Sequence, residues 1–129
     1  MKILNKEIDF DFFDAEQMEK YEKESEIAQK EISFMIANTK TMKQSELINK
    51  TCTTIERCFD NVFGEGTSEK IFEKKRNLRL CVKAFKDLLN ARKEQENEID
   101  SEIKDFQKEL KEINVEYKPN RATRRAKKW

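Results

Sequence analysis

Two glycines that lie close together divide the apolar pattern of this chain into two helical stretches. Gly64 and Gly66 are the only glycines among its 129 residues. On both sides of them, apolar residues recur at steps of three and four, which is the spacing of one face of an α-helix. The first stretch holds Ile48, Cys52, Ile55, Phe59, Val62 and Phe63, and the second holds Leu78, Cys81, Val82, Phe85, Leu88 and Leu89. Because glycine accepts the left-handed backbone at which many helices end, we expect a helix, a sharp break and a second helix packed against the first.

The break itself is long enough for a short helix. Thr67 or Ser68 can cap its N-terminus, and Ile71 and Phe72 give it an apolar side. Asn77 is a suitable cap for the long helix that follows. The sequence FGEGTS lacks the spacing and the Lys-Ser/Thr pair of a phosphate-binding loop, so we interpret it as a turn.

Two further helical segments are predicted around and before this break. Asp14, followed three residues later by Gln17, is typical of a capping box, and a three-four apolar pattern then extends to about Ala37. The polar residues 38–43 separate this helix from the next one, which we expect over about residues 43–63.

The N-terminal residues are the one place where strands are expected. Residues 2–4 and 7–10 flank a small turn at Asn5-Lys6. A lone two-stranded hairpin is marginal in water unless it packs on something else, and three aromatic rings can supply that contact, namely Phe10, Phe12 and Phe13. These rings either cap the helical core or form a surface on which a partner docks.

The last helix is expected to run from Leu78 to about Asn114, and an apolar seam continues along its second half. At about 1.5 Å per residue it spans roughly 54 Å, about twice the length of the preceding helix. Unless the chain bends near residues 92–97 or the first helix lies beside it, part of the seam stays uncovered and needs a partner. We predict that this partner binds Ile99, Ile103, Phe106, Leu110 and Ile113, with Phe10, Phe12 and Phe13 as the second choice.

Charge is distributed unevenly along the chain. Charged residues make up 41% of it, well above the roughly 25% of ordinary domains, so we expect long exposed helical faces and a thin core. Nine acids lie from Glu7 to Glu26, whereas residues 118–129 hold six basic residues and no acid. The predicted fold is all-α, with three main helices, one short helix after the glycines and a small N-terminal hairpin. Its single helical domain covers residues 1–117, and a basic, flexible tail covers residues 118–129.

The residue types argue against catalysis and metal binding. The chain has no histidine, and Cys52, Cys58 and Cys81 lack the spacing of a metal site. Each cysteine lies in or beside an apolar stripe, so we expect buried, reduced thiols, which suit a cytoplasmic protein. There is no nucleophile elbow and no glycine-rich phosphate cradle. We predict no catalytic residue, no enzyme activity, no metal and no cofactor.

The start of the chain lacks the features of a targeting signal. The N-terminal sequence MKILNKEIDF has no apolar run like that of a signal peptide, and no segment approaches the length of a membrane span. We expect a soluble protein without a membrane partner.

The basic tail is a second candidate binding segment. Pro119 stops any helix from the preceding residues, and Asn120 can cap a short basic helix before Trp129. The cations that this helix would present are Arg121, Arg124, Arg125, Lys127 and Lys128. Six charges alone give only weak, salt-sensitive affinity for nucleic acid. The tail is therefore either solvated, bound to an acidic protein surface such as that of another copy, or, least expected, bound to nucleic acid.

Three segments together resemble a family of small proteins from tailed phages and prophages of Gram-positive bacteria. These segments are KILNKEIDFDFFDAEQMEKYE near the N-terminus, FDNVFGEGTSEKIF followed by NLRLCVKAF in the middle, and PNRATRRAKK at the end. Proteins of this type look like tail-assembly chaperones, encoded between the tail-tube and tape-measure genes. The chain departs from the family at Leu4-Asn5-Lys6, where an Asn-Gly hairpin turn is expected.

The resemblance implies a non-enzymatic helical protein that coats the long, aggregation-prone tape-measure protein. It would hold that client in solution, help recruit tail-tube subunits and leave before the virion is complete, in the cytoplasm of the bacterial host. Self-association is also expected of such a protein. Two other functions stay open: a small nucleic-acid-binding regulator that acts through the basic tail, and a phage inhibitor of a host system.

Overall fold

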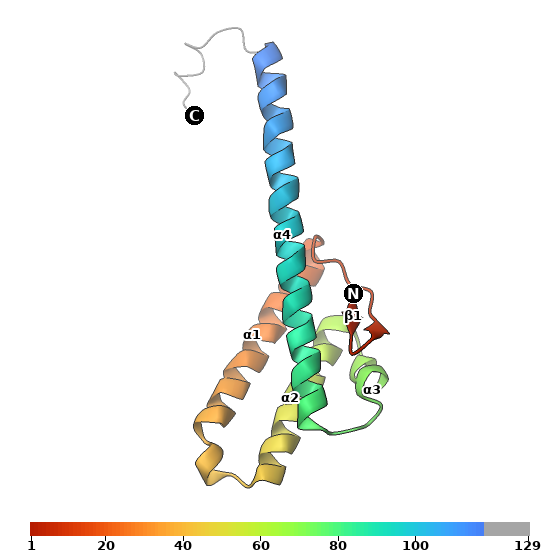
Figure 1. Ribbon diagram of the computed structural model, residues 1–129, viewed down its shortest axis with the longest axis vertical. Helices are drawn as coiled ribbons and strands as arrows, with labels where there is room; N and C mark the ends of the chain where they lie inside the picture. Colours follow the sequence, from red (N-terminus) through yellow and green to blue (C-terminus); the bar gives the residue numbers. More distant parts are fainter. Residues whose placement is uncertain (118–129) are drawn as a thin grey trace. The chain divides into compact units, whose positions relative to one another are not determined.

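The computed structural model describes the backbone of residues 1–117 and the side chains of residues 1–113. This part of the chain contains four α-helices: α1 (Ala15–Ala37), α2 (Gln44–Phe63), α3 (Thr67–Phe72) and α4 (Leu78–Tyr117). A short hairpin of β1 (Lys2–Ile3) and β2 (Lys6–Glu7) precedes them, and a 3₁₀ turn, η1 (Thr39–Thr41), joins α1 to α2 (Figure 1). The predicted all-α fold, with three main helices, one short helix after the glycines and an N-terminal hairpin, is confirmed.

The chain divides into two compact units, which are described separately. The first covers Met1–Gln95 and the second Glu96–Trp129, and α4 contributes residues to both. The predicted basic tail, residues 118–129, lies outside the described residues. The single domain expected over residues 1–117 stays a prediction. None of the helices within residues 1–117 has a stretch long and apolar enough to cross a membrane.

The N-terminal hairpin forms without a glycine. Its strands pair antiparallel, with Ile3 opposite Lys6, and its two turn residues, Leu4 and Asn5, have φ angles of 49° and 67°. Asparagine tolerates this left-handed region better than most residues. The turn is therefore centred on Leu4-Asn5, one residue earlier than predicted. The backbone N–H of Leu4 donates to the Asp87 carboxylate of α4 at 3.0 Å, which anchors the turn.

Side-chain caps explain where two of the long helices begin. The Asp14 carboxylate accepts a hydrogen bond from the backbone N–H of Gln17 at 3.0 Å. The Gln17 side chain in turn accepts from the N–H of Asp11 at 3.0 Å, rather than from the N–H of Asp14 as in a capping box. Asn77 caps α4 by accepting from two backbone N–H groups of the first turn, at 2.9 and 3.2 Å. The capping roles predicted for Asp14 and Asn77 are confirmed.

α2 ends at the predicted residue, and the two glycines carry the chain into α3. Gly64 and Gly66 have φ angles of 114° and 90°, which glycine adopts without the penalty that other residues carry. The cap of α3 differs from the prediction, because neither Thr67 nor Ser68 caps it with a side chain. Instead, the carboxylate of Asp60 in α2 accepts from the N–H of Ser68 at 2.8 Å and from its hydroxyl at 2.9 Å. A side chain of the preceding helix thus accepts the hydrogen bonds that the first turn of α3 donates.

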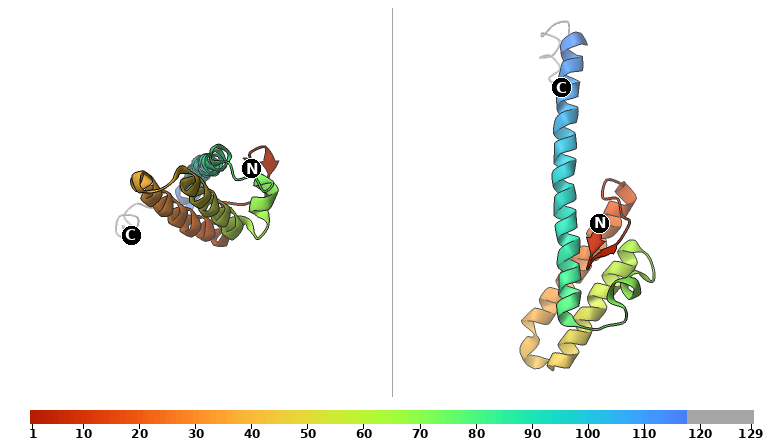
Figure 2. Two further views of the ribbon diagram at one scale, coloured as in Figure 1. Left: turned by 90° about the horizontal axis from the view of Figure 1, so that it is seen from below. Right: turned by 45° about the vertical axis from the view of Figure 1, so that its right-hand side comes forward.

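The core of the first unit is built around one side of α2. Helices α1 and α2 lie side by side and run antiparallel in both Figures 1 and 2. The hairpin, α3 and the first turns of α4 add residues to the same apolar cluster. Its largest fully buried side chains are Ile3, Cys52, Ile55, Phe59, Phe72, Cys81 and Leu88. The apolar stripes on both sides of the glycines therefore meet as predicted, with the Cys52 and Cys81 sulfurs 2.9 Å apart.

All three cysteines are free and buried, as predicted. Burial raises the pKa of Cys58 to about 12, and the nearby carboxylate of Glu24 adds to the effect. Burial also raises the pKa of Cys81, with a further contribution from its hydrogen bond to Cys52. Cys58 and Cys81 stay protonated near neutral pH, so they act as small apolar core residues.

Candidate partner-binding surfaces

The five seam residues predicted from the sequence lie in the second unit, on one face of α4. We refer to Ile99, Ile103, Phe106, Leu110 and Ile113 as the α4 stripe. Ile99 is partly covered, whereas the other four side chains are between 42% and 59% exposed. Scattered exposed apolar residues are normal on protein surfaces, but a contiguous row on one helical face marks a candidate interaction site.

The charged residues nearest to the α4 stripe are acidic, and the lysines lie farther from it. At about 100° per residue, Glu102 and Glu109 fall roughly 60–80° from the centre of the α4 stripe, along its edge. Lys104, Lys108 and Lys111 fall roughly 120–180° away, on the opposite side. All five charged residues are exposed. A partner of the α4 stripe therefore meets carboxylates at its edge, not lysines.

Of the three N-terminal rings proposed as a second docking surface, Phe13 is the most exposed, at 49%. Phe12 is 3% exposed, and its ring packs edge-on against Phe10 and Tyr21 at centroid distances of 4.9 and 5.3 Å. Phe10 is half-buried and also packs edge-on against Phe63 at 4.8 Å. Phe12 is therefore a core residue, and its buried ring is not available to a partner.

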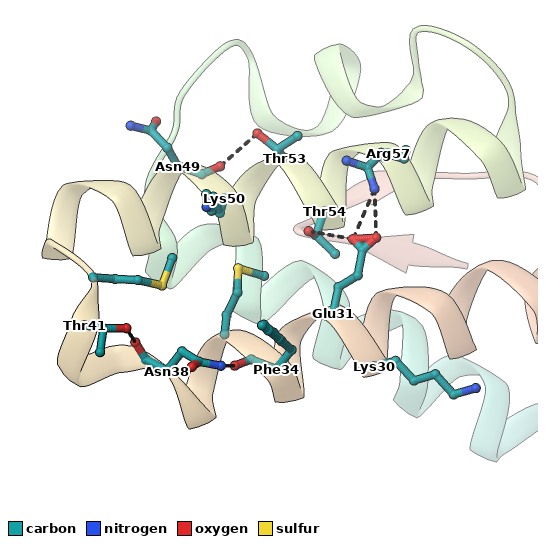
Figure 3. A pocket seen from close by; sticks show the side chains of 12 residues that line it. Lys30, Glu31, Phe34, Asn38, Thr41, Asn49, Lys50, Thr53, Thr54 and Arg57 are labelled. Carbon is teal, nitrogen blue, oxygen red and sulfur yellow. Dashed lines mark hydrogen bonds and ion pairs between the residues drawn. The ribbon is translucent and has the colours of Figure 1, made fainter.

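The first unit contains an apolar surface that the sequence analysis did not single out. It is a groove of about 840 Å³ between α1 and α2, which we refer to as the α1–α2 groove (Figure 3). Its large apolar lining residues are Phe34, Met35 and Met42. Its charged lining residues are Lys30, Glu31, Lys50 and Arg57, which come from both helices.

One ion pair joins the two helices along the groove. Arg57 of α2 places Nη1 3.0 and 3.1 Å from the two carboxylate oxygens of Glu31 in α1. The Thr54 hydroxyl donates to the same carboxylate at 3.2 Å, and Figure 3 shows the three side chains converging. Arg57 thus balances the charge of Glu31, and the other charged residues of the lining are Lys30 and Lys50, each in an exposed pair with a glutamate of its own helix.

A sequence signal for this groove exists at the end of α1. Phe34, Met35 and Ile36 follow one another there, and consecutive helical residues point about 100° apart, so one core cannot cover all three. Met35 is buried and its sulfur accepts from the Thr51 hydroxyl at 3.8 Å. Phe34 and Ile36 are left 58% and 65% exposed. The run of three large apolar residues thus indicates that some of them lie outside the core.

The remaining candidate residues belong to the basic tail. Arg121, Arg124, Arg125, Lys127 and Lys128 lie outside the described residues. Within the described part of the chain, no group of three or more histidine, cysteine, aspartate or glutamate residues is placed to hold a metal ion. The α4 stripe and the α1–α2 groove both combine apolar contact area with edge charges, which is the chemistry of protein binding.

Comparison with known proteins relates this chain to one sequence family. No curated protein and no solved structure matches the chain. The sequence profile of a family of unknown function, DUF6673, matches residues 4–128. The match includes all four helices and therefore both surfaces described above. The chain belongs to the family of unknown function DUF6673.

Proposed function

We propose that this protein is a non-enzymatic chaperone of phage tail assembly, which binds the tape-measure protein and helps recruit tail-tube subunits. The observation that carries the proposal is the α4 stripe, a row of exposed apolar side chains on a highly charged helix. The sequence resemblance supplies the client, a long protein that aggregates when it is alone. In this proposal the protein acts in the cytoplasm of the bacterial host.

The α4 stripe has the spacing that a helical client requires. Its residues follow one another at alternating steps of four and three, which are the a and d positions of a heptad repeat and pack into holes on a facing helix. Complete burial of one such side chain contributes roughly 1.5–3 kcal/mol, while association and side-chain ordering oppose binding by several kcal/mol. Five residues therefore support a complex that forms and also dissociates, as a chaperone that leaves the finished particle must.

Co-expression with the tape-measure protein of the same genome, followed by pull-down at moderate salt, tests the proposal. We expect the client to be insoluble alone and to co-purify in soluble form with this protein. If the client stays insoluble and nucleic acid elutes with the protein instead, the chaperone proposal is wrong.

The double substitution Ile103→Asp/Phe106→Asp tests the role of the α4 stripe directly. Both residues are at least half exposed, so the variant should keep its helical circular-dichroism signal and bind the client at least about tenfold more weakly. The matched control Lys104→Asp/Lys108→Asp adds two aspartates on the opposite side of the same helix and should bind as the wild type does. Loss of helical signal in the first variant alone would mean that the stripe is ordinary core.

The basic tail favours a second candidate function, that of a nucleic-acid-binding regulator. Residues 118–129 hold six basic residues and no acid, and contacts between such residues and phosphates weaken steeply as salt rises. Deletion of residues 118–129 separates the two functions, because a regulator loses retardation of DNA or RNA whereas a chaperone still binds its client. A phage inhibitor of a host system would use the same exposed surfaces, and its genome neighbourhood would lack tail genes.

A further inference from the structure

Two apolar surfaces of this chain carry opposite charges. The α4 stripe is edged by Glu102 and Glu109, and residues 96–113 hold seven acids against three lysines. The α1–α2 groove is lined by three cations and one carboxylate, and that carboxylate, Glu31, lies 3.0 Å from Arg57. An acidic apolar ridge and a basic apolar groove are electrostatically complementary.

Pairing of two α4 stripes with each other is opposed by these charges. With the stripe at heptad positions a and d, Glu102 and Glu109 both fall at position g, and Asp100 and Gln107 fall at position e. In an antiparallel pair the g positions face each other, so glutamate meets glutamate. In a parallel pair g faces e of the partner, so Glu102 meets Gln107. Neither arrangement gains an ion pair, so the stripe favours a partner that has cations at its edges.

The α1–α2 groove offers such cations on both of its sides. Lys30 of α1 and Lys50 of α2 are both exposed. Each contacts a glutamate one turn earlier on its own helix, Glu26 at 3.1 Å and Glu46 at 3.9 Å. Exposed pairs of this kind contribute at most about 1 kcal/mol to stability. Both lysines can therefore exchange these contacts for carboxylates of a partner.

The apolar floor of the groove suits a row of side chains from a helix. Phe34 is more than half exposed and lies beside Met35 and Met42, and methionine adapts its shape to different partners. The volume of about 840 Å³ is near the upper end of the roughly 300–1,000 Å³ of ordinary ligand pockets. The groove therefore has room for several side chains rather than one.

We propose that the α1–α2 groove binds the α4 stripe of a second copy of this chain. Phe106 contacts Phe34 and the two methionines, while Glu102 and Glu109 face Lys30 and Lys50. The contact is heterologous, since each copy offers one groove and one stripe. If each of two copies places its stripe in the groove of the other, a closed dimer forms. If each copy binds a different neighbour, a longer assembly forms. This inference concerns the chain without a client and does not depend on the proposed chaperone function.

Sedimentation of the full-length chain over a range of concentrations is the first test. The average mass of the wild type should rise above that of a monomer, and the association should weaken as salt is added because exposed charges contribute to it. A wild-type chain that stays monomeric up to millimolar concentration overturns the proposal.

Two single substitutions then separate the two surfaces. Phe34→Asp puts a carboxylate into the groove and Phe106→Asp puts one into the stripe, and both positions are more than half exposed. Each variant alone should be monomeric where the wild type associates, because every copy lacks one side of the contact. A mixture of the two should form a 1:1 dimer, since the first variant still offers a stripe and the second still offers a groove.

The controls are Ile36→Asp and Lys108→Asp, which change exposed residues outside both surfaces. Both should associate as the wild type does, and circular dichroism should show that every variant is folded. If Phe34→Asp alone still associates, the stripe binds a different surface and the proposal is wrong. The proposal is also wrong if the mixture of Phe34→Asp and Phe106→Asp yields no heterodimer. Failure to bind the tape-measure protein, in contrast, contradicts only the chaperone proposal.

Charge reversal gives a second test that leaves the apolar residues in place. Glu102→Lys/Glu109→Lys should weaken the self-association at least about tenfold. Adding Lys30→Glu/Lys50→Glu to the same chain should restore it, because the opposite charges then face each other again. If the second pair of substitutions fails to restore association, the groove is not the site that receives the stripe.

Discussion

Asp60 is the residue on which the turn between α2 and α3 depends. Its carboxylate accepts from the N–H and the hydroxyl of Ser68 at 2.8 and 2.9 Å, in place of a cap from within α3. Its carbonyl also accepts from the N–H of Gly64 at 2.9 Å, where α2 ends. A helix as short as α3 has few hydrogen bonds of its own, so it relies on this external acceptor.

Asp60→Ala is expected to lower the free energy of unfolding by about 1–2 kcal/mol, because the cap of α3 loses its acceptor. Chemical denaturation followed by circular dichroism measures this change. Glu65→Ala, an exposed position in the same turn, is the control and should change stability by less than about 0.5 kcal/mol. Equal effects of the two substitutions would mean that the Asp60 carboxylate does not hold α3.

The buried thiols make stability fall at alkaline pH. Burial raises the pKa of Cys58 from 9.0 to about 12, so the folded chain keeps a proton that the unfolded chain loses. The stability that this protonated thiol contributes to the folded chain is complete below about pH 9 and is lost as pH rises through the raised pKa. At about pH 8 a thiol reagent should label all three cysteines in denaturant and none in the folded chain. Rapid labelling of the folded chain would contradict their burial.

The hairpin, whose two strands are the shortest elements within residues 1–117, depends on contacts with distant residues. Leu4 is tied to Asp87 of α4 through its backbone N–H. Lys6 forms an ion pair with Glu73, just after α3, and donates to the carbonyl of Lys70 at 3.1 Å. Contacts with residues more than sixty positions away therefore hold a hairpin that is marginal by itself.

Titration of Glu73 reports on the attachment of the hairpin. The hydrogen bond from Lys6, with its positive charge, holds the pKa of Glu73 below its ordinary value. The contribution of this pair to folding stability is present above the ordinary pKa of Glu73 and is lost as pH falls through its lowered pKa. Lys6→Ala should raise the pKa of Glu73, as measured by NMR of the side-chain carboxyl. Lys2→Ala, on the other strand, should leave it unchanged. A pKa that does not respond to Lys6→Ala would show that the pair does not form in solution.

At the scale of the whole molecule, the two units differ in how their residues are covered. All fully buried side chains of the described residues belong to the first unit. Among residues 96–113 no side chain is buried. A helical segment with no buried side chain gains little from packing and depends mainly on its own hydrogen bonds and side-chain pairs, and such segments are marginally stable in water.

Hydrogen exchange should therefore differ strongly between the units. Amides of residues 52–59 in α2 should exchange through global unfolding, whereas those of residues 99–113 should exchange through local opening, at least about a hundredfold faster. A partner bound to the α4 stripe should slow exchange in the second range only. Equal protection of both ranges in a monomeric sample would show that the stripe is already covered.

Elements whose causes are local could be predicted from the amino-acid sequence. The bounds of α1 and α2 follow from apolar periodicity and from the residues that break it, and the caps at Asp14 and Asn77 need only their own neighbours. The burial of the three cysteines was also predictable, because each lies within an apolar stripe. The position of the α4 stripe follows from the same periodicity, since a three-four repeat fixes which residues share a face.

Which of these faces are covered became clear from the three-dimensional structure. It placed Phe12 in the core, left Phe34 exposed beside the α1–α2 groove, and used Asp60 rather than Thr67 or Ser68 to cap α3. It also left four residues of the α4 stripe exposed. Each of these outcomes depends on which distant segments meet in space, and a periodic pattern does not contain that information. An apolar residue is buried only if another element occupies the space over it, and long-range packing alone settles that.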